Sequence, residues 1–544
     1  MAFSSKGLTH RSTVTSKRGM VASAHPLASL AGIQILMDGG NAIDSAIATA
    51  AALNVVEPYM SGIGGVGYMH IFSSKKKEQR VLDYIGLTPA AAELSLYSKE
   101  SDQERGPLAP IVPGACAGWL EALAQYGTMD PGTVFSPAIE FAEQGYPLTV
   151  KNSAFFEPAV ESLIKYSQAS ARYLINGQVP RPGEIIIQPE LARTFRMVAE
   201  LGSDVFYKGA IAEQIVAHMQ SIGGLITAED LSRFAPVWQD PVFVDYRGYK
   251  VCVPPPPCQA VQFLEILNIM EGFEVSELGH NTVETLHCFF EAAKLSIADR
   301  AEFTAIDQPP TYGLLSKEFS AERRSLIGER ARPSGGDLFT ARKMADEVLA
   351  GDPYAFLQTE CTTHFDTIDS EGNAVACTQS LGSGFGSAIV VPSTGITLNN
   401  FMRWFDQEPT SPNAIGPSKK IEMCVSPVQI WDDGGLRLLI GTPGSYGILQ
   451  TTPQMIMNVI DHDMNIQAAI EAARAKTERG FKISAEDRIG DEVFAQLERR
   501  GHQINRLGDW SPGVGGGQGI MIDPNSGAFM GGADPRRDGY AIGW

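Results

Sequence analysis

The first 90 residues change from helix-like to strand-like spacing of apolar positions. Apolar side chains over 27–36 follow a roughly helical period and stop at a Gly-Gly pair, and a second helix, capped by its first asparagine, covers 41–56. Short apolar runs at 68–72 and 80–84 then flank a lysine-rich segment. This pattern predicts two helices followed by a β-hairpin.

Helical spacing dominates the middle of the chain, and strand-like runs return near residue 360. The predicted middle elements are helices at 117–126, 190–201, 211–222, 260–270 and 282–303, with a stiff proline run at 254–257 and a loop at 334–341. Turn residues separate β-favouring runs at 364–380 and 519–531, which predicts two more hairpins. A strand at 436–440 precedes a helix at 448–460. Strands near both ends therefore predict one intertwined α+β unit whose sheet is completed by distant parts of the chain.

The composition of the chain argues against some classes of binding partner. The 544 residues include 43 basic and 62 acidic side chains, a formal net charge of −19, and 44% are hydrophobic. This is ordinary globular composition, without the basic excess that neutralises the phosphates of a nucleic acid or an anionic membrane. The most apolar stretch, 46–56, is too short to cross a bilayer. We therefore expect a protein that acts on small molecules, with no nucleic-acid or membrane partner.

Cysteine and histidine usage bears on the compartment and on metals. The seven cysteines are scattered and odd in number, and the first twenty residues lack the apolar core of a secretory signal. Both features favour a cytoplasmic protein with reduced thiols. The nine histidines are dispersed, and no Cys-x-x-Cys or His-Glu-x-x-His spacing occurs. We expect no metal and no cofactor.

Two local motifs are candidates for chemistry. The glycine cluster at 62–67 lies between a predicted helix and a strand, the reverse of the order that dinucleotide binding requires, so a close backbone approach is the better interpretation. Thr362-Thr363-His364 by itself is typical of a strand. A threonine hydroxyl becomes a useful nucleophile next to a base such as a free α-amine, which Thr362 would gain only if the Cys361–Thr362 bond were cleaved.

The motifs around this threonine resemble the γ-glutamyltransferase family of N-terminal-nucleophile hydrolases. The similarity continues in family order over nearly the whole chain. The matching segments include Gly39-Gly-Asn-Ala-Ile-Asp44, Val112-Pro-Gly114, Ala298-Asp-Arg300, Thr362-Thr-His-Phe365, Gly395-Ile-Thr-Leu-Asn-Asn400, Ser426-Pro427, Gly441-Thr-Pro-Gly444 and Asp534-Pro-Arg536.

The resemblance implies a four-layer αββα sandwich and a precursor that cleaves itself between Cys361 and Thr362. A large subunit, 1–361, and a small catalytic subunit, 362–544, would then form one intertwined domain. The resemblance also implies either one such heterodimer or a dimer of heterodimers, acting on a small-molecule amide.

Roles carry over to matching positions. Thr362 corresponds to the nucleophile, Thr363 lies beside it, and Ser380 stands where the family has a threonine that hydrogen-bonds to the nucleophile. Gly444 and Ser445 stand at a Gly-Gly pair whose backbone N–H groups form the oxyanion hole. Outside the proposed chemistry, Asn400 is interpreted as ordering its loop and His364 as structural.

The chain departs from the family where a free amino-acid head group is held. Ile85 replaces an arginine, Gly382 an asparagine, Met423-Cys424 a pair of serines, and Phe401 and Trp404 the amine-binding residues. Burying a zwitterion without partners costs several kcal/mol. These replacements predict a more apolar or flatter acyl group, with Arg403 and Tyr446 as candidate partners for a carboxylate; the alternative is that the aromatics merely fill a vestigial pocket.

Three hypotheses remain open at this point. The first is a self-processing threonine amidohydrolase or acyltransferase whose substrate is not a γ-glutamyl compound. The second is a genuine γ-glutamyltransferase or glutathione hydrolase with a rebuilt donor site. The third is a relative that binds a metabolite without catalysis, which would have no need of Thr362, Thr363, Ser380 and Gly444.

Overall fold

A computed structural model describes residues 6, 7, 9–304, 309–334 and 360–544. The chain forms two compact units, and each draws on residues from both sides of Thr362. Unit 1 comprises 1–16, 240–357 and 422–536, and unit 2 comprises 17–239, 358–421 and 537–544. Most of the predicted loop at 334–341 lies outside the described residues. Within the described part, no helix combines the length and the apolarity needed to cross a membrane.

Unit 2 is built on an antiparallel seven-stranded sheet with the order β21-β2-β10-β11-β3-β4-β7. Its strands are β2 (Gly19–Ser23), β3 (Val66–Ser73), β4 (Glu78–Asp83), β7 (Val237–Gln239), β10 (Glu360–Asp369), β11 (Ala374–Ser383) and β21 (Tyr540–Gly543). The predicted hairpins appear as β3–β4 and β10–β11. Strand β2 pairs with both β10 and β21, so segments from the start, middle and end of the chain complete one sheet, as predicted.

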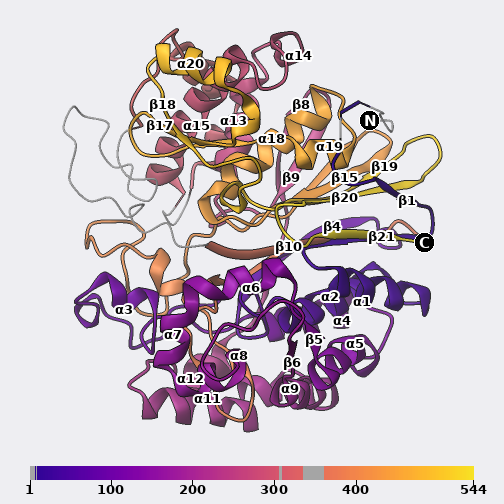
Figure 1. Ribbon diagram of the computed structural model, residues 1–544, viewed down its shortest axis with the longest axis vertical. Coiled ribbons are helices and arrows are strands. Elements are labelled where there is room, and N and C mark those ends of the chain that lie inside the picture. Colours follow the sequence, from indigo (N-terminus) through magenta and orange to yellow (C-terminus); the bar gives the residue numbers. More distant parts are fainter. Residues whose placement is uncertain (1–5, 8, 305–308, 335–359) are drawn as a thin grey trace. The chain divides into compact units, whose positions relative to one another are not determined.

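Helices cover one face of this sheet (Figure 1). Asn41 and Asp44 form a capping box at the start of α2, and every residue of α2 is buried. The larger helices of the unit are α1 (Pro26–Met37), α2 (Ala42–Val56), α4 (Ala115–Tyr126), α5 (Pro131–Gln144), α9 (Pro189–Leu201) and α11 (Ala210–Ser221). The prediction omitted α5. Its proline at position 137 is a helix-breaking signal, although Asp130 caps the helix and Pro131 begins it.

Shorter elements complete unit 2. They are α3 (Glu100–Glu104), α6 (Val150–Phe156), α7 (Val160–Lys165), α8 (Ser167–Tyr173), α10 (Asp204–Tyr207), α12 (Ala228–Arg233), the paired strands β5 (Tyr146–Pro147) and β6 (Ile185–Ile186), the paired strands β12 (Val390–Val391) and β13 (Ile396–Thr397), and the 3₁₀ turn η4 (Phe401–Trp404). The hydrophobic core of the unit lies between the sheet and these helices.

Unit 1 contains a second seven-stranded antiparallel sheet, ordered β1-β20-β19-β15-β14-β9-β8. The strands are β1 (Val14–Ser16), β8 (Val242–Tyr246), β9 (Tyr249–Val253), β14 (Val428–Asp432), β15 (Gly435–Gly441), β19 (Gln518–Ile522) and β20 (Phe529–Ala533). The hairpin predicted at 519–531 is β19–β20. The predicted proline run connects β9 to α13.

The helices of unit 1 gather on one face of its sheet (Figure 1). They are α13 (Val261–Met270), α14 (Val275–Leu278), α15 (Val283–Phe303), α16 (Thr311–Leu314), α17 (Lys317–Ser325), α18 (Ile448–Ile460), α19 (Ile466–Glu471) and α20 (Asp491–Arg499), and a small sheet contains β16 (Ala475–Thr477), β17 (Lys482–Ala485) and β18 (Gln503–Arg506). The main sheet of each unit is thus antiparallel and covered by helices, which confirms the α+β class.

Candidate active site

Thr362 lies near the start of β10, where the pairing with β11 is irregular. Cys361 is opposite Gly382 and Thr363 is opposite Gln379, so two residues of β11, Ser380 and its successor, face Thr362 alone. Such a β-bulge re-aims side chains and is frequent beside active sites. Here it brings the Thr362 Oγ1 atom to 3.3 Å from Ser380 Oγ, to which it donates a hydrogen bond.

Ser380 is held in turn by the backbone. The N–H of Gly382 donates to Ser380 Oγ at 2.8 Å. Thr362 and Ser380 are both buried, with 3% and 1% of their surfaces exposed. A hydroxyl fixed by a backbone donor orients the neighbouring hydroxyl, so Ser380 fixes the direction of Thr362 Oγ1. Three residues predicted for the site, Thr362, Ser380 and Gly382, are therefore adjacent.

Thr363 and the backbone of Thr362 contact two charged residues that the sequence analysis did not single out. Thr363 Oγ1 donates to Glu57 Oε2 at 3.1 Å, and Arg537 Nη1 donates to the carbonyl oxygen of Thr362, also at 3.1 Å. Glu57 follows α2, and Arg537 lies 175 positions after Thr362. No local pattern marks either residue as part of a site.

His364 takes part in a closed hydrogen-bond network. Its Nδ1 lies 2.8 Å from Thr378 Oγ1 and its Nε2 lies 3.1 Å from Asp366 Oδ2. Both ring nitrogens are engaged and the side chain is fully buried. Burial raises the pKa of the Asp366 carboxyl, and the nearby imidazole opposes this shift. These contacts support the structural interpretation of His364.

The glycine cluster is a site of close backbone approach, as predicted. A β-carbon built on Gly65 would collide with the carbonyl oxygen of Ser380, and one on Gly64 would collide with that of Thr397. The Gly65 N–H closes a turn by donating to the Gly62 carbonyl at 2.8 Å. The cluster lets this segment press against β11 behind Ser380.

The aromatic residues predicted to line the acyl pocket belong to the 3₁₀ turn η4. The Phe401 and Trp404 rings pack with their centroids 5.0 Å apart, and both side chains are buried. A β-carbon on Gly382 would lie 3.1 Å from Trp404 Cζ3, so the indole reaches the residue that holds Ser380. Arg403 is engaged, because its Nη1 donates to Ser383 Oγ at 2.9 Å and its Nε lies 3.7 Å from Glu104 Oε1.

Two other predicted positions have clear local roles. Asn400 orders its loop, as predicted, because its Oδ1 accepts from the Ser383 N–H at 2.8 Å and its Nδ2 donates to the Glu104 carbonyl at 2.7 Å. Ile85 is buried after β4, and its N–H donates to Asp83 Oδ1 at 2.9 Å. Trp404 of η4 therefore lies beside Gly382. Among the described hydrogen bonds, none joins Ile85 to η4 or to Gly382.

The remaining predicted residues belong to unit 1. Gly444 and Ser445 follow β15 with φ values of 134° and 49°, so Ser445 has a left-handed conformation that favours glycine. Its buried Oγ has no hydrogen-bond partner among the described residues. Tyr446 lies under the Arg300 guanidinium, 4.9 Å from its ring centroid. The roles of these residues toward Thr362 stay predictions.

Met423 and Cys424 are both buried in a segment that pairs with the proline run. The Met423 N–H donates to the Pro257 carbonyl at 3.2 Å, and its own carbonyl accepts from the Gln259 N–H at 2.8 Å. Their place in the acyl pocket also stays a prediction.

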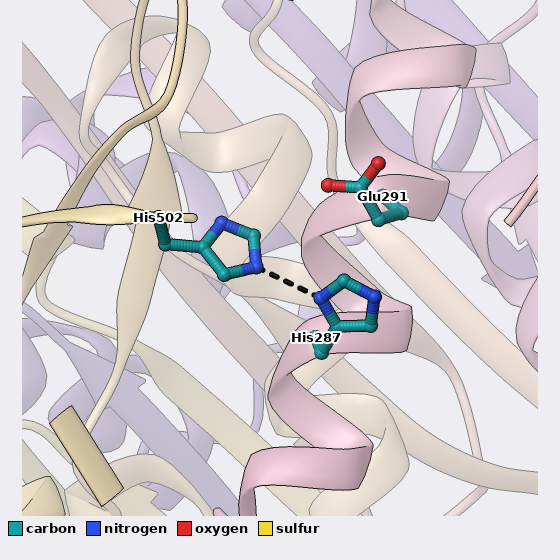
Figure 2. A group of neighbouring side chains, drawn as sticks. All are labelled: His287, Glu291 and His502. Atoms are coloured by element: carbon teal, nitrogen blue, oxygen red, sulfur yellow. Dashed lines mark hydrogen bonds between the residues drawn. The ribbon is translucent and has the colours of Figure 1, made fainter. Parts of the chain in front are cut away.

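One group of described residues has the composition of a metal site. His287 and Glu291 on α15 lie near His502, with possible ligand atoms within 4.8 Å of one another (Figure 2). The hydrogen bonds already account for these atoms. His287 Nε2 donates to the Gly328 carbonyl at 2.8 Å, so its Nδ1 is the acceptor in the 2.9 Å bond from His502 Nε2.

The charges around this group disfavour a cation. Lys294 Nζ donates to Glu291 Oε1 at 2.7 Å, which neutralises the carboxylate. Burial, followed by the charge of Lys294, lowers the pKa of His502 to about 3. A divalent ion would be placed beside a buried ammonium group, so we interpret His287 and His502 as a neutral hydrogen-bonded pair.

Comparison with known proteins identifies the family of the chain. The family model described as gamma-glutamyltranspeptidase matches residues 28–544. The chain is 35% identical to the acylase ACY 1 proenzyme of Pseudomonas sp. (strain V22), over 97% of this chain and 94% of the relative. It is 34% identical to the glutathione hydrolase proenzyme of Bacillus subtilis (strain 168), over 97% of this chain and 92% of the relative.

Solved structures agree as well. A cephalosporin acylase from Bacillus halodurans superposes with a TM-score of 0.89 at 34% identity, covering 99% of this chain and 98% of that chain. The γ-glutamyltranspeptidase of Helicobacter pylori superposes with a TM-score of 0.54 at 32% identity, covering 60% of this chain and 93% of that chain. With a family match over most of its length and relatives aligned nearly end to end, the chain belongs to the γ-glutamyltranspeptidase family of N-terminal-nucleophile hydrolases.

Proposed function

We propose that the chain is a self-processing amidohydrolase or acyltransferase that uses Thr362 as its nucleophile and cleaves a small amide whose acyl group is not γ-glutamyl. The observation that carries this proposal is the contrast within unit 2. The Thr362–Ser380–Gly382 arrangement is complete, whereas the neighbouring head-group positions hold a glycine and two buried aromatic residues.

Maturation would begin with attack of Thr362 Oγ1 on the carbonyl carbon of Cys361. The Cys361–Thr362 C–N bond breaks as a C–O ester bond forms, and the nitrogen of Thr362 takes up the hydroxyl proton. Water then hydrolyses the ester, which leaves a carboxylate on Cys361 and a free α-amine on Thr362. The products are the proposed subunits 1–361 and 362–544.

Turnover would repeat this chemistry on the substrate. The α-amine accepts the proton of Thr362 Oγ1 as the hydroxyl attacks the amide carbon, and it returns the proton to the leaving amine. Water or an acceptor amine then releases the acyl group from the Thr362 ester. We assign stabilisation of the oxyanion to the backbone N–H groups of Gly444 and Ser445.

The indole of Trp404 favours an acyl group other than γ-glutamyl. Its Nε1 is buried and has no acceptor among the described residues. An indole N–H can only donate, so it cannot hold the α-ammonium of a γ-glutamyl group. Arg403 is already paired with Glu104 and Ser383. An apolar acyl group carrying a hydrogen-bond acceptor fits these surroundings.

The glutathione hydrolase relative keeps a second candidate function open, namely a γ-glutamyl hydrolase or transferase with a rebuilt donor site. The acylase relative supports the first candidate at nearly the same identity. Free thiols at every cysteine whose side chain is described support our proposal of a cytoplasmic enzyme.

Intact-mass measurement of the purified protein tests the proposed chemistry. Wild type should give two chains cut before Thr362, Thr362→Ala should stay one chain, and Thr362→Ser, which keeps the hydroxyl, should still be cut. A panel of acyl anilides then separates the functions. Faster turnover of apolar or oxo-acyl anilides than of the γ-glutamyl anilide supports the proposal. Preferred turnover of the γ-glutamyl anilide supports the second candidate, and an uncut, inactive wild type indicates a non-catalytic relative.

A further inference from the structure

Arg537 is a buried cation beside the backbone of the nucleophile. Its side chain is 1% exposed, and its Nη1 contacts the Thr362 carbonyl oxygen and Met60 Sδ, each at 3.1 Å. Its guanidinium carbon also lies 5.2 Å from the centroid of the Phe155 ring. Within the described residues Arg537 has no carboxylate within 4.0 Å, and its Nε has no partner. A buried charge in this state needs an opposite charge nearby.

Glu57, near the other end of the sequence, supplies the opposite charge when its carboxyl is ionised. It follows α2, is 1% exposed, and accepts the hydrogen bond of Thr363 Oγ1. Burial raises the pKa of the Glu57 carboxyl to about 7, and the attraction of Arg537 opposes this shift. The pKa of the Glu57 carboxyl therefore depends on the charge of Arg537, although no charged atoms of the two side chains lie within 4.0 Å of each other.

The two charged residues hold consecutive residues of β10. Side chains alternate along a strand, so the hydroxyl of Thr362 points to the face of Ser380 and that of Thr363 to the other face, toward Glu57. Arg537 holds the carbonyl between these two residues. Neither charged group is bonded to Thr362 Oγ1, so both act on the nucleophile only through its strand.

Met60 connects Glu57 and Arg537 to the β-bulge opposite Thr362. Its N–H donates to the Glu57 carbonyl at 2.9 Å, and its own carbonyl accepts from the N–H of Leu381 at 2.9 Å. Leu381 is the extra residue of β11 opposite Thr362. One short segment therefore joins Glu57, Arg537 and the bulge that places Ser380.

We propose that Arg537 and Glu57 form a buried charge pair that positions Thr362 for self-cleavage and for turnover. This inference rests on the proposed function, because it concerns the orientation of the same nucleophile. Arg537 fixes the peptide plane after Thr362, and Glu57 fixes Thr363 while balancing the charge of Arg537. The net charge of the pair also acts on the α-amine of Thr362 once cleavage has released it.

Other groups near the pair are accounted for. Asp538 raises the pKa of Glu57, and it accepts a hydrogen bond from the Thr149 hydroxyl. Burial raises the pKa of Tyr59 well above its ordinary value, so its phenol stays neutral. Burial lowers the pKa of His25 to about 4, so its imidazole is also neutral near pH 7. Lys151 Nζ donates to the backbone carbonyl of Arg537 at 2.9 Å, so an ammonium group also lies beside the pair. The variants change the charges of Arg537 and Glu57 and leave Lys151 and Asp538 in place.

Three variants test the pair in the full-length protein. Arg537→Met removes the cation and the bond to the Thr362 carbonyl, Arg537→Lys keeps the charge, and Glu57→Gln keeps an acceptor for Thr363 but removes the anion. Arg172→Met is the matched control, since Arg172 is an arginine of unit 2 whose side chain is 6% exposed and is paired with Glu190. Self-cleavage is followed by intact mass, and turnover by an anilide that the wild type hydrolyses.

Arg537→Met should slow self-cleavage and lower kcat of the matured fraction by about 10- to 100-fold, as expected for a misplaced nucleophile, with KM changed less than about threefold. Arg537→Lys should recover part of both rates. The acid limb of the kcat/KM profile should move to higher pH in Arg537→Met and to lower pH in Glu57→Gln, each by about half to one unit, because a nearby cation favours the neutral amine and an anion disfavours it.

Wild-type rates and profiles in both Arg537→Met and Glu57→Gln would overturn the proposal. So would losses that follow thermal stability alone, as expected for Arg172→Met. If Arg537→Met fails to fold, the kcat/KM profiles of Arg537→Lys and Glu57→Gln are compared instead. An unchanged profile in Glu57→Gln then overturns the proposed balance of charge between Arg537 and Glu57. A wild type that neither cleaves itself nor turns over any amide refutes the proposed function, whereas an active wild type with indifferent variants refutes only the positioning pair.

Discussion

Replacing Gly382 by alanine tests whether the surrounding structure requires glycine at this position, where the family has an asparagine. Gly382 has a φ of 102°, and a β-carbon there would lie well inside 3.0 Å of Asn400 Oδ1. That oxygen accepts the Ser383 N–H at 2.8 Å. The substitution must therefore strain the backbone and displace a buried amide, and any larger side chain, including the family's asparagine, would do the same.

The two costs can be estimated separately. A non-glycine residue in the left-handed region costs roughly 1–2 kcal/mol. Displacing Asn400 leaves the buried Ser383 N–H without its acceptor, which costs about 1–3 kcal/mol. We expect Gly382→Ala to lower the free energy of unfolding of unit 2 by about 2–5 kcal/mol. Activity should also fall, because the Gly382 N–H holds Ser380 Oγ.

Gly372→Ala is the control for backbone strain. Gly372 lies in the same unit with a φ of 84°, and the nearest atom to its built β-carbon is 3.9 Å away, so only the cost of roughly 1–2 kcal/mol applies. Urea unfolding, followed by circular dichroism in the uncut Thr362→Ala background, measures both variants as single chains.

The double variant Gly382→Ala/Asn400→Ala isolates the collision with Asn400. Removing the amide should make the double variant less unstable than the sum of the single changes. Equal costs at Gly372 and Gly382, or strict additivity with Asn400→Ala, would refute the reasoning.

Three further changes follow from the same contacts. Ser445→Gly should stabilise the protein by about 1 kcal/mol, because it removes a left-handed non-glycine residue and a buried hydroxyl without a partner; a lower thermal midpoint would contradict this. The folded-state pKa of Glu57, about 7, lies above its ordinary value of 4.5. The stability that the protonated carboxyl contributes at low pH is therefore lost as the pH rises from about 4.5 to 7. Glu57→Gln should lack this loss in urea midpoints measured across that range. His502→Ala should lower the free energy of unfolding by about 1–3 kcal/mol by leaving His287 Nδ1 unpaired, while a chelator should leave the thermal midpoint of the wild type unchanged; a midpoint lowered by the chelator would point to a bound metal.

The sequence alone determined the elements with strong local signals. The helices over 41–56 and 448–460 and the hairpins around residues 370 and 525 form where apolar period, capping residues and turn residues agree. The family motifs also placed Thr362 and Ser380 in one site. These signals are local, and short-range backbone preferences produce them directly. The same preferences did not reveal α5, where an interior proline opposes a helix that its cap and packing stabilise.

Only the tertiary structure decided how Thr362, the proposed nucleophile, is held. A bulge between β10 and β11, which no composition marks, aligns Thr362 with Ser380. Glu57 reads in the sequence as the end of a helix, and Arg537 as one of several surface cations. Burial gives both their significance, because a charge removed from water interacts strongly with the few groups around it. Which groups those are depends on the long-range pairing that joins the first, middle and last segments of the chain in one sheet, and that information is absent from any local stretch of sequence.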